Sequence, residues 1–228
     1  MPRWTVERGT LWALEAGGGL PAPFPARVET TFREIEQTDL DQLAAAMGLP
    51  TAELIQKRLQ GNRRCFILKA GGQIASYGWV SHGPEYVGEL ERQFNLDDDE
   101  AYIWDCATVP AWRGQRCYSN LLSRLIYPLH EEGVPRIWIG ASRQNRPSVR
   151  GFINAGFEPV LDLIYRRIYR LTFLWIDLAQ PVSPSLAAAG YRILLNEDER
   201  RFGPLAIGFR RRPIKENRVP EPKLVSGP

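Results

Sequence analysis

The sequence has few residues of the kinds that hold metals or cross-link small secreted domains. Its 228 residues include three cysteines and two histidines, and Cys65, Cys106 and Cys117 form no C-x-x-C pair. Zinc sites and disulfide frameworks need such residues at close or regular spacing. We therefore predict neither a metal site nor disulfides, and a reducing compartment fits the sequence best.

Long apolar runs are also missing. Near the N-terminus Glu7, Arg8 and Glu15 interrupt the only apolar stretch, so no signal-peptide core is expected. The most apolar later segment, residues 171–179, contains Asp177 and has about half of the roughly 20 residues that a membrane helix needs. These absences predict a cytoplasmic protein with no membrane span.

An excess of charge of one sign is lacking as well. The formal net charge is +3, and the one dense basic cluster, Arg210 to Arg212, lies in a proline-containing tail. Proteins that follow a phosphate backbone gather many basic residues on one face or tail, so nucleic acid is not an expected partner. A function in which this tail binds nucleic acid is kept as one alternative. The 44% hydrophobic and 24% charged content is that of a globular protein with one main domain.

Three segments are distinguished by composition. Residues 1–27 are interpreted as an arm, because a Gly-Gly-Gly run and three prolines do not build a helix or strand for long. Residues 28–170 form the regular domain, and residues 171–228 are a C-terminal extension with a helix fragment at 185–191 and the basic tail. Within the domain, strands are expected at 30–35, 65–68, 74–80, 101–109, 136–141 and 157–169, with an extended stretch at 87–96. Helices are expected at 38–47, 51–60 and 118–132 and between Asn145 and Gly156.

The strongest chemical signal is the order strand, tight loop, amphipathic helix across residues 109–118, VPAWRGQRCY. A strand that runs through such a loop into a helix leaves the first backbone N–H groups of the helix unpaired, where the helix dipole favours an anion. Arg113 and Arg116 add positive charge at the same place. The segment therefore predicts a pyrophosphate site. It is neither a Walker loop nor a dinucleotide fingerprint, because G-K-[ST] and G-x-G-x-x-G are absent.

At these residues the chain resembles the GNAT superfamily of N-acetyltransferases, whose acyl-CoA loop reads V-x-P-x-x-R-G-x-G-x-G/A before a long helix. Residues 109–118 supply V, P, R and G, and residues 145–148 with 154–157 resemble the family's N-x-x-S/A and G-F segments. The resemblance covers residues 28–170. It implies an α/β (α+β-like) fold: a mixed, mostly antiparallel sheet with helices on both faces, N- and C-terminal extensions, and acyl-CoA bound where the sheet opens beside the strand that ends at Val109.

The resemblance also implies the reaction. An acetyl or other acyl group would pass from acyl-CoA, with acetyl-CoA as donor, to a primary amine of a small molecule or peptide that attacks the thioester directly. A non-catalytic CoA-binding module is the alternative, and a homodimer is left open. The implied donor-binding residues are Ala107, Thr108, Val109, Arg113, Gly114, Gln115, Arg116, Cys117, Tyr118, Ser119 and Asn145.

Two positions depart from the family pattern. Arg116 stands where the family has glycine, at a cost of about 1 kcal/mol if the position needs a positive φ. Phe152 stands where the family commonly has a tyrosine that protonates the departing thiolate, so Tyr118 is the predicted acid. Asn145 has a second interpretation as a helix N-cap. No histidine lies near Cys117 in the sequence, so a Cys–His mechanism is not predicted.

Asp105 is the predicted base. It is expected to share a strand face with Ile103, Ala107 and Val109 near the cleft, flanked by apolar groups. A purely structural, hydrogen-bonded carboxylate is the alternative interpretation. In that case the base would be Glu89 or Glu91 on the neighbouring extended segment.

Overall fold

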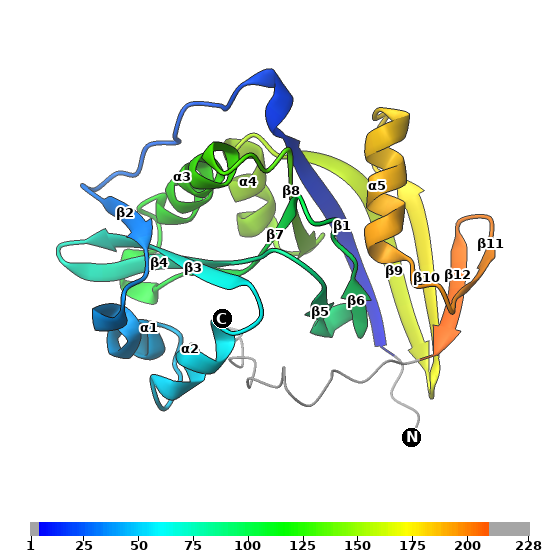
Figure 1. The fold of residues 1–228 in the computed structure, drawn as a ribbon, viewed down its shortest axis with the longest axis horizontal. Helices are drawn as coiled ribbons and strands as arrows, with labels where there is room; N and C mark the ends of the chain where they lie inside the picture. Colours follow the sequence, from blue (N-terminus) through cyan, green and yellow to red (C-terminus); the bar gives the residue numbers. More distant parts are fainter. Residues whose placement is uncertain (1–4, 210–228) are drawn as a thin grey trace.

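The computed structural model describes residues 5–209, which form a large mixed sheet with helices on both faces (Figure 1). The strands are β1 (Thr5–Glu15), β2 (Thr31–Glu34), β3 (Arg63–Ala70), β4 (Gln73–Ser81), β5 (Glu85–Val87), β6 (Arg92–Phe94), β7 (Glu100–Thr108), β8 (Arg136–Ser142), β9 (Glu158–Ile168), β10 (Leu171–Leu178), β11 (Arg200–Phe202) and β12 (Leu205–Phe209). The α-helices are α1 (Leu40–Ala46), α2 (Glu53–Arg58), α3 (Cys117–Glu131), α4 (Arg146–Asn154) and α5 (Pro184–Leu194), with short 3₁₀ turns η1 (Ala16–Gly18), η2 (Gln37–Asp39), η3 (Gly88–Leu90) and η4 (Pro110–Trp112).

The ten strands of the large sheet described here follow the order β11-β12-β10-β9-β1-β8-β7-β4-β3-β2. Every neighbouring pair is antiparallel except β7 and β8. Helices α3 and α4 pack on one face, and α1, α2 and α5 cover the other. The predicted fold class, a mixed and mostly antiparallel sheet between helices, is confirmed. Within residues 5–209 no helix combines the length and the apolar character that crossing a bilayer requires.

The elements expected between residues 30 and 169 are present, with one difference. The stretch at 87–96 was expected to be extended throughout, but β5 and β6 form a separate two-stranded sheet joined by η3. The chain reverses at Glu91, whose φ of 47° lies in the left-handed region. A positive φ interrupts an extended strand, which explains why this segment is a hairpin.

Strand β1 corrects the interpretation of residues 1–27 as an arm without lasting structure. Residues 5–15 form a strand of 11 residues in the interior of the sheet, between β8 and β9. Its central residues are buried on both faces: Leu11 packs on the α5 side and Trp12 on the α3 side. A strand buried on both faces shows an apolar run and no alternation, so the pattern expected of a half-buried strand is absent from the sequence.

A segment that we call the N-terminal strap, residues 16–28, leaves β1, crosses the outer side of α3 and leads to β2 at the opposite edge of the sheet (Figure 1). Polar side chains of α3 hold it in place. Asn120 Nδ2 donates to the Phe24 carbonyl at 2.6 Å, the Phe24 N–H donates to Ser123 Oγ at 2.8 Å, and Tyr127 Oη donates to the Pro21 carbonyl at 3.0 Å. The glycine- and proline-rich composition thus belongs to an extended segment with fixed contacts.

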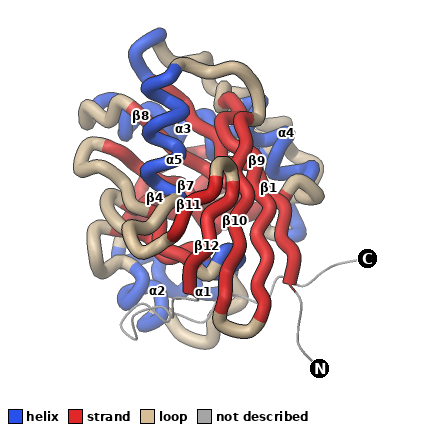
Figure 2. The backbone as a smooth tube through the Cα atoms, turned by 90° about the vertical axis from the view of Figure 1, so that its right-hand side faces the viewer, coloured by secondary structure: helices blue, strands red, loops and turns tan. Residues whose placement is uncertain are grey.

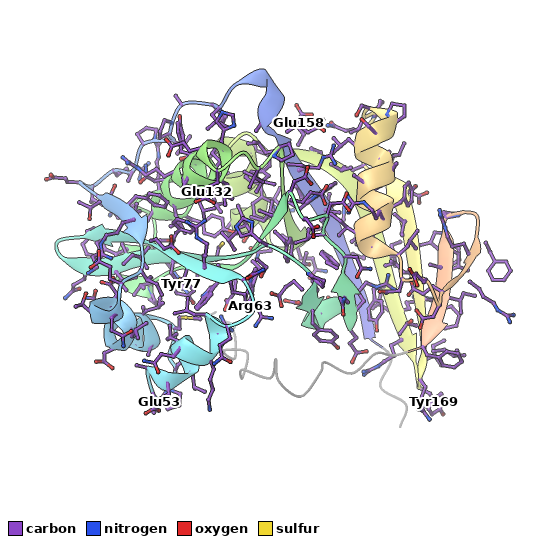
Figure 3. All side chains as sticks on the ribbon, viewed as in Figure 1. Glu53, Arg63, Tyr77, Glu132, Glu158 and Tyr169 are labelled. Atoms are coloured by element: carbon purple, nitrogen blue, oxygen red, sulfur yellow. The ribbon has the colours of Figure 1, made fainter. Side chains whose placement is uncertain are left out.

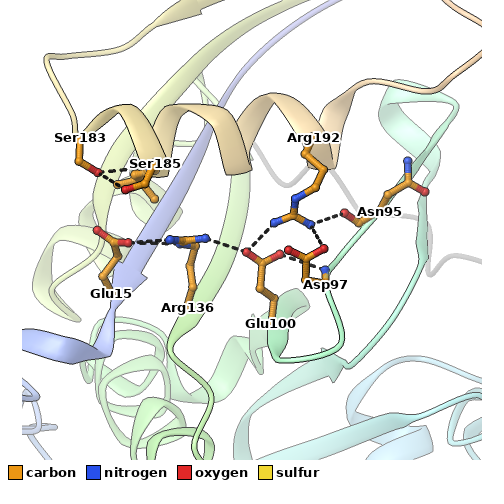
Figure 4. A network of polar contacts seen from close by, with 9 residues as sticks. Glu15, Asn95, Asp97, Glu100, Arg136, Ser183, Ser185 and Arg192 are labelled. Atoms are coloured by element: carbon orange, nitrogen blue, oxygen red, sulfur yellow. Dashed lines mark hydrogen bonds and ion pairs between the residues drawn. The ribbon is translucent and has the colours of Figure 1, made fainter.

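The C-terminal segment continues the same sheet. Figure 2 shows β9, β10 and β12 side by side, and α5 covers the face of these strands that carries the buried Leu174 and Ile176. A chain of ion pairs joins α5 to the rest of the sheet (Figure 4): Arg192 contacts Glu100 at 2.9 Å, and Glu100 contacts Arg136 at 3.0 Å. The predicted helix fragment at 185–191 is α5. The basic cluster from residue 210 to residue 212 lies outside the described residues.

Candidate active site

The sheet opens between its two parallel strands. β7 and β8 pair from Glu100 opposite Arg136 to Ile103 opposite Ile139, although both strands continue beyond this point. The end of β7 stays paired with β4 and the end of β8 stays paired with β1, so the two strands separate. A cavity of about 410 Å³ occupies the opening and is lined from β1, β7, β8, α2, α4 and the β5–β6 hairpin. The opening lies beside the strand that leads to Val109, as the sequence predicts.

A β-bulge on β7 shapes the wall of this cavity. Trp104 lies opposite Trp79 and Ala107 opposite Tyr77, so two β7 residues, Asp105 and Cys106, face one residue of β4. Asp105 has a φ of 42°, inside the left-handed region. A bulge adds a residue and breaks the alternation of side chains along a strand.

The bulge changes which side chains share a face. Ile103 packs in the cluster beneath α3, whereas Ala107 packs in the cluster beneath α1 and α2. Asp105 points to the second side, where it meets α2. The expectation that Asp105 shares a face with Ile103 is therefore wrong, because Asp105 itself belongs to the bulge and its positive φ breaks the alternation of side chains.

Arg58, the last residue of α2, is the nearest charged partner of Asp105. Its Nη1 donates to Asp105 Oδ2, and its guanidinium lies 5.2 Å from the ring centroid of Trp79 and 5.0 Å from that of Trp104. The side chain of Arg58 is 3% exposed and that of Asp105 is 23% exposed. Besides the apolar groups expected beside it, this carboxylate thus has a buried cationic partner that the sequence does not predict. Arg58 was missed in the sequence because it reads there as an ordinary end of an amphipathic helix.

Three glutamates, Glu85, Glu89 and Glu91, also lie at or near the cavity. Glu85 lines the cavity and is buried, and it accepts two hydrogen bonds of 2.7 Å from Arg63, which points toward the β5–β6 hairpin in Figure 3. Glu91 contacts Arg167 at 2.5 Å and does not line the cavity. Glu89 is exposed and lines it, and it has no ion pair within residues 5–209. Of the two predicted alternative bases, Glu89 is the one at the cavity.

The predicted pyrophosphate loop connects β7 to α3 through η4. Gly114 has a φ of 79° and Arg116 a φ of 62°, so the condition under which Arg116 carries a cost at a glycine position, a positive φ, is met. Within the described part of the chain no side chain caps the first turn of α3. The N–H groups of that turn therefore lack a side-chain acceptor, and Arg113, Gly114 and Arg116 are exposed around them.

Other predicted donor-binding residues are engaged in local contacts. The Val109 N–H donates to the Ala75 carbonyl at 2.9 Å, and the Ala107 carbonyl accepts the Ser76 hydroxyl at 2.7 Å. The Ser76 hydroxyl also lies 3.2 Å from that of Thr108. These contacts fix the end of β7 against β4, so the loop leaves the sheet in a defined direction.

The first turn of α3 is packed against α4. Asn154 Nδ2 donates to Ser119 Oγ at 3.0 Å. Cys117 is 1% exposed, and burial raises the pKa of its thiol. A buried thiol with a raised pKa is a poor nucleophile, in agreement with the prediction that no Cys–His mechanism operates.

Tyr118 lines the cavity from the start of α3. Its ring lies against Gly151 of α4, where a Cβ atom would come within 2.3 Å of Tyr118 Cδ1. Burial raises the pKa of the Tyr118 phenol well above its ordinary value, and a hydrogen bond with Ser148 acts in the opposite direction. Phe152 lines the same cavity and is 1% exposed, so the side chains of Tyr118 and Phe152 both lie at this site.

Asn145 directly precedes α4 and also lines the cavity. Its Oδ1 accepts a hydrogen bond of 3.3 Å from the Ser148 N–H, so the N-cap interpretation is confirmed. The side chain is exposed on its other side. Among residues 5–209 no group of three or more metal-binding side chains lies together.

Comparison with known proteins gives one sequence match and several similar folds. The pattern of the acetyltransferase (GNAT) family matches residues 30–157. No curated protein matches the chain. β1 and most of the C-terminal strands lie outside the matched residues.

The solved structures with similar folds are distant in sequence. The GCN5-related N-acetyltransferase from Sphaerobacter thermophilus is 16% identical, and the match covers 73% of this chain and 53% of that chain with a TM-score of 0.53. The GCN5-related N-acetyltransferase from Kribbella flavida is also 16% identical over 73% of this chain and 60% of its own, with a TM-score of 0.51. The ribosomal-protein-S18-alanine N-acetyltransferase from Escherichia coli is 19% identical over 57% of this chain and 78% of its own, with a TM-score of 0.45.

The structural similarity to the first two proteins extends beyond residues 30–157 and concerns the fold. The chain spans little more than half the length of those two proteins. The sequence match covers more than half of this chain and contains the loop, both helices that flank the cavity, and the two parallel strands. The chain therefore belongs to the GNAT acetyltransferase family.

Proposed function

We propose that this protein is an N-acetyltransferase that transfers an acetyl or other acyl group from acyl-CoA to a primary amine. The observation that carries the proposal is the connection between two features. An uncapped helix N-terminus with exposed arginines opens directly beside a cavity that holds a carboxylate and a phenol. The first feature suits a diphosphate, and the second suits proton transfer at the end of the same ligand.

The donor would bind in two parts. The pyrophosphate would accept hydrogen bonds from the N–H groups of the first turn of α3, with Arg113 and Arg116 adding positive charge. Tyr118 lies in the first turn of α3, Asn145 caps α4, and both side chains line the cavity. The thioester arm would therefore pass between them into the opening of the sheet. Backbone N–H groups beside the thioester carbonyl would stabilise the negative charge that develops on its oxygen.

The reaction would be a direct acyl transfer. The lone pair of a neutral amine attacks the thioester carbonyl carbon, the C–N bond forms, and the C–S bond breaks with its electron pair on sulfur. The amine nitrogen loses one proton to a base of the enzyme, and the departing thiolate receives one proton from an acid. Positioning of the two reactants contributes most of the rate.

Asp105 is the proposed base, acting directly or through water. Its Oδ2 is engaged by Arg58, whereas Oδ1 has no hydrogen-bond partner among residues 5–209. Arg58 would thus hold the carboxylate in one orientation and leave one oxygen for the proton. Glu89 is the second candidate, because it lines the cavity and forms no ion pair with the described residues.

Tyr118 is the proposed acid. Phe152 supplies no phenol at the position where the family commonly has tyrosine, and the Tyr118 ring reaches the same cavity from the other helix. The Tyr118 phenol is protonated near neutral pH and can donate, and burial, which raises its pKa, makes it a weaker acid. The thiolate is a fairly good leaving group, so this assistance is expected to be modest.

The alternative is a non-catalytic CoA-binding module, which the absence of the usual tyrosine at position 152 keeps open. One pair of measurements separates the two. A rise in melting temperature with CoA establishes donor binding, and release of free thiol from acetyl-CoA in the presence of a panel of amines establishes transfer. Binding without amine-dependent thiol release for every amine would favour the module, and no binding would remove both.

A further inference from the structure

The N-terminal strap contacts the proposed pyrophosphate loop at Arg27. The Arg27 N–H donates to the Gln115 carbonyl at 2.9 Å, and Arg27 Nη1 donates to the Gly114 carbonyl at 3.3 Å. In a trans peptide group the N–H points opposite to the C=O, and no peptide bond in the described residues is cis. Because Arg27 holds two successive carbonyls, the N–H groups that follow them point away from the strap. The Gln115 N–H donates to the Trp112 carbonyl at 3.4 Å, and the Arg116 N–H has no hydrogen bond among residues 5–209.

The strap has its own anchors on both sides of this contact. Before it, Phe24 exchanges hydrogen bonds with Ser123 and Asn120 of α3 at 2.8 and 2.6 Å. After it, the Thr30 hydroxyl donates to Asn120 Oδ1 at 3.2 Å. Pro25, which fixes its own φ, lies between these contacts. The position of Arg27 is therefore set by α3 itself, the helix whose first turn follows the loop.

The strap also affects the charge at the loop. Arg27 is exposed, as are Arg113 and Arg116, so three guanidinium groups belong to this region. The Arg116 guanidinium carbon lies 5.7 Å from the centroid of the Phe24 ring, within the range of a cation–π contact. One strap residue thus holds the loop backbone, and another lies against its charged side chain.

We propose that the N-terminal strap is part of the donor site: Arg27 holds the Gln115 carbonyl through its main-chain N–H and the Gly114 carbonyl through its guanidinium, and so orients the Arg116 N–H toward the phosphates. The inference rests on the proposed function and deepens it, since the strap precedes the residues that the family pattern matches. Arg27 is a positioning residue for the loop N–H groups, and its effect should appear only with a donor that carries phosphates.

The test compares two donors in the full-length protein. Isothermal titration gives Kd for CoA, and steady-state kinetics give KM and kcat for acetyl-CoA and for acetyl-pantetheine, which lacks the phosphates. We expect Arg27→Pro, which removes the main-chain donor to the Gln115 carbonyl, to weaken the binding of CoA about tenfold and to raise KM for acetyl-CoA. Arg27→Ala keeps this donor and loses only the contact with the Gly114 carbonyl, so its effect should be smaller. The kcat value at saturation and all constants for acetyl-pantetheine should change less than twofold in both variants.

Arg170, exposed in the turn between β9 and β10, offers a control for the loss of one positive charge, and Arg170→Ala should leave CoA affinity unchanged. Wild-type affinity for CoA in Arg27→Pro would overturn the inference, and so would equal losses with both donors, which indicate a general effect on folding. Should Arg27→Pro not fold, the same comparison in Arg27→Ala decides. Failure of the wild-type protein to bind CoA would instead overturn the proposed function.

Discussion

Arg58 of α2 and Asp105 of β7 form an ion pair at the wall of the cavity, and the indole rings of Trp79 and Trp104 enclose the guanidinium. The pair joins a helix to a bulged strand, so it has a structural role whatever its chemical role is. Removing one partner of a buried pair commonly costs about 3–5 kcal/mol, and less where one partner is partly exposed, as Asp105 is. Tests of Asp105 therefore need both an activity and a stability measurement.

Asp105→Asn should lower kcat/KM at least tenfold, because the amide cannot accept the amine proton, while Kd for CoA stays within twofold. Kinetics with acetyl-CoA and titration with CoA measure the two effects, and the melting temperature reports the loss of the ion pair. Glu89→Gln is the matched control at a second carboxylate of the cavity. Full activity in Asp105→Asn with a lower melting temperature would make Asp105 structural, and a loss in Glu89→Gln would then identify the base.

Tyr118→Phe should reduce kcat less than Asp105→Asn reduces kcat/KM, by about three- to tenfold, although general acids can contribute about 10²- to 10⁴-fold. The thiolate leaves fairly well without assistance, which limits the loss. The substitution removes only the hydroxyl, so packing of the ring against Gly151 is retained. Tyr191→Phe in α5 is the control. An unchanged kcat in Tyr118→Phe would exclude the phenol as the acid.

Two substitutions of Gly114 test the donor site, because aspartate and asparagine have nearly the same shape and differ in charge. Its φ of 79° suits glycine and is tolerated by asparagine and aspartate, and a Cβ there would meet no atom within 4 Å. Gly114→Asp should lower the affinity for CoA at least tenfold because its carboxylate repels the pyrophosphate, whereas Gly114→Asn should lower this affinity much less. Titration with CoA measures both. Equal affinities for the two variants would argue against a phosphate at this loop.

Arg116→Gly should raise the free energy of unfolding by up to about 1 kcal/mol, because glycine adopts the φ of 62° without strain. Denaturant unfolding measures this gain. Affinity for CoA should nevertheless fall, and Arg116→Ala should weaken the binding of CoA more than it weakens the binding of pantetheine, which lacks the pyrophosphate. If Arg116→Gly instead tightens CoA, the arginine obstructs the site and the binding-module alternative becomes stronger.

Asp39 makes stability dependent on pH. Burial acts to raise its pKa, but hydrogen bonds from Arg33 at 2.6 Å and Lys69 at 2.8 Å outweigh burial and lower the pKa to about 2. A folded-state pKa below the unfolded value means that the stabilisation is present above about pH 4 and is lost as the pH falls toward 2. Asp39→Asn should cost about 2 kcal/mol at pH 7 and about half of that at pH 3.

Denaturant unfolding at the two pH values checks this expectation, with the exposed Asp41→Asn as the control. The sign follows from proton binding: in the wild-type protein the unfolded state takes up the Asp39 proton first as the pH falls. An equal cost of Asp39→Asn at pH 7 and pH 3 would show that the charge of the carboxylate is not the source of the stabilisation.

The donor loop shows why part of this site could be read from the sequence. Residues 109–119 are contiguous, and the conformation of Gly114, the exposure of Arg113 and the uncapped start of α3 follow from local backbone preferences. The amphipathic helix and the hairpin at Gly71 and Gly72 are local in the same sense.

The cavity wall shows what local preferences leave open. The bulge at Asp105 depends on the register between β4 and β7, and Arg58 reaches it from a helix 47 residues earlier in the chain. An expectation based on strand alternation placed Asp105 with Ile103, since nothing in the sequence around the bulge marks the extra residue. A count of side chains along one strand cannot reveal how the partner strand is paired.

By itself, therefore, the sequence determined most of the helices and strands between residues 30 and 169 and the loop that suits a phosphate, because periodicity and turn chemistry act over a few residues. The fold class followed from the resemblance of these segments to a known family. Only the tertiary structure decided that β1 lies between β8 and β9, that the strap holds the loop through Arg27, and that Arg58 pairs with Asp105. These arrangements join segments up to 152 residues apart, as in the hydrogen bond from Thr10 to Asp162. Their stability comes from burial and pairing in the assembled sheet, which no single segment possesses before the chain folds.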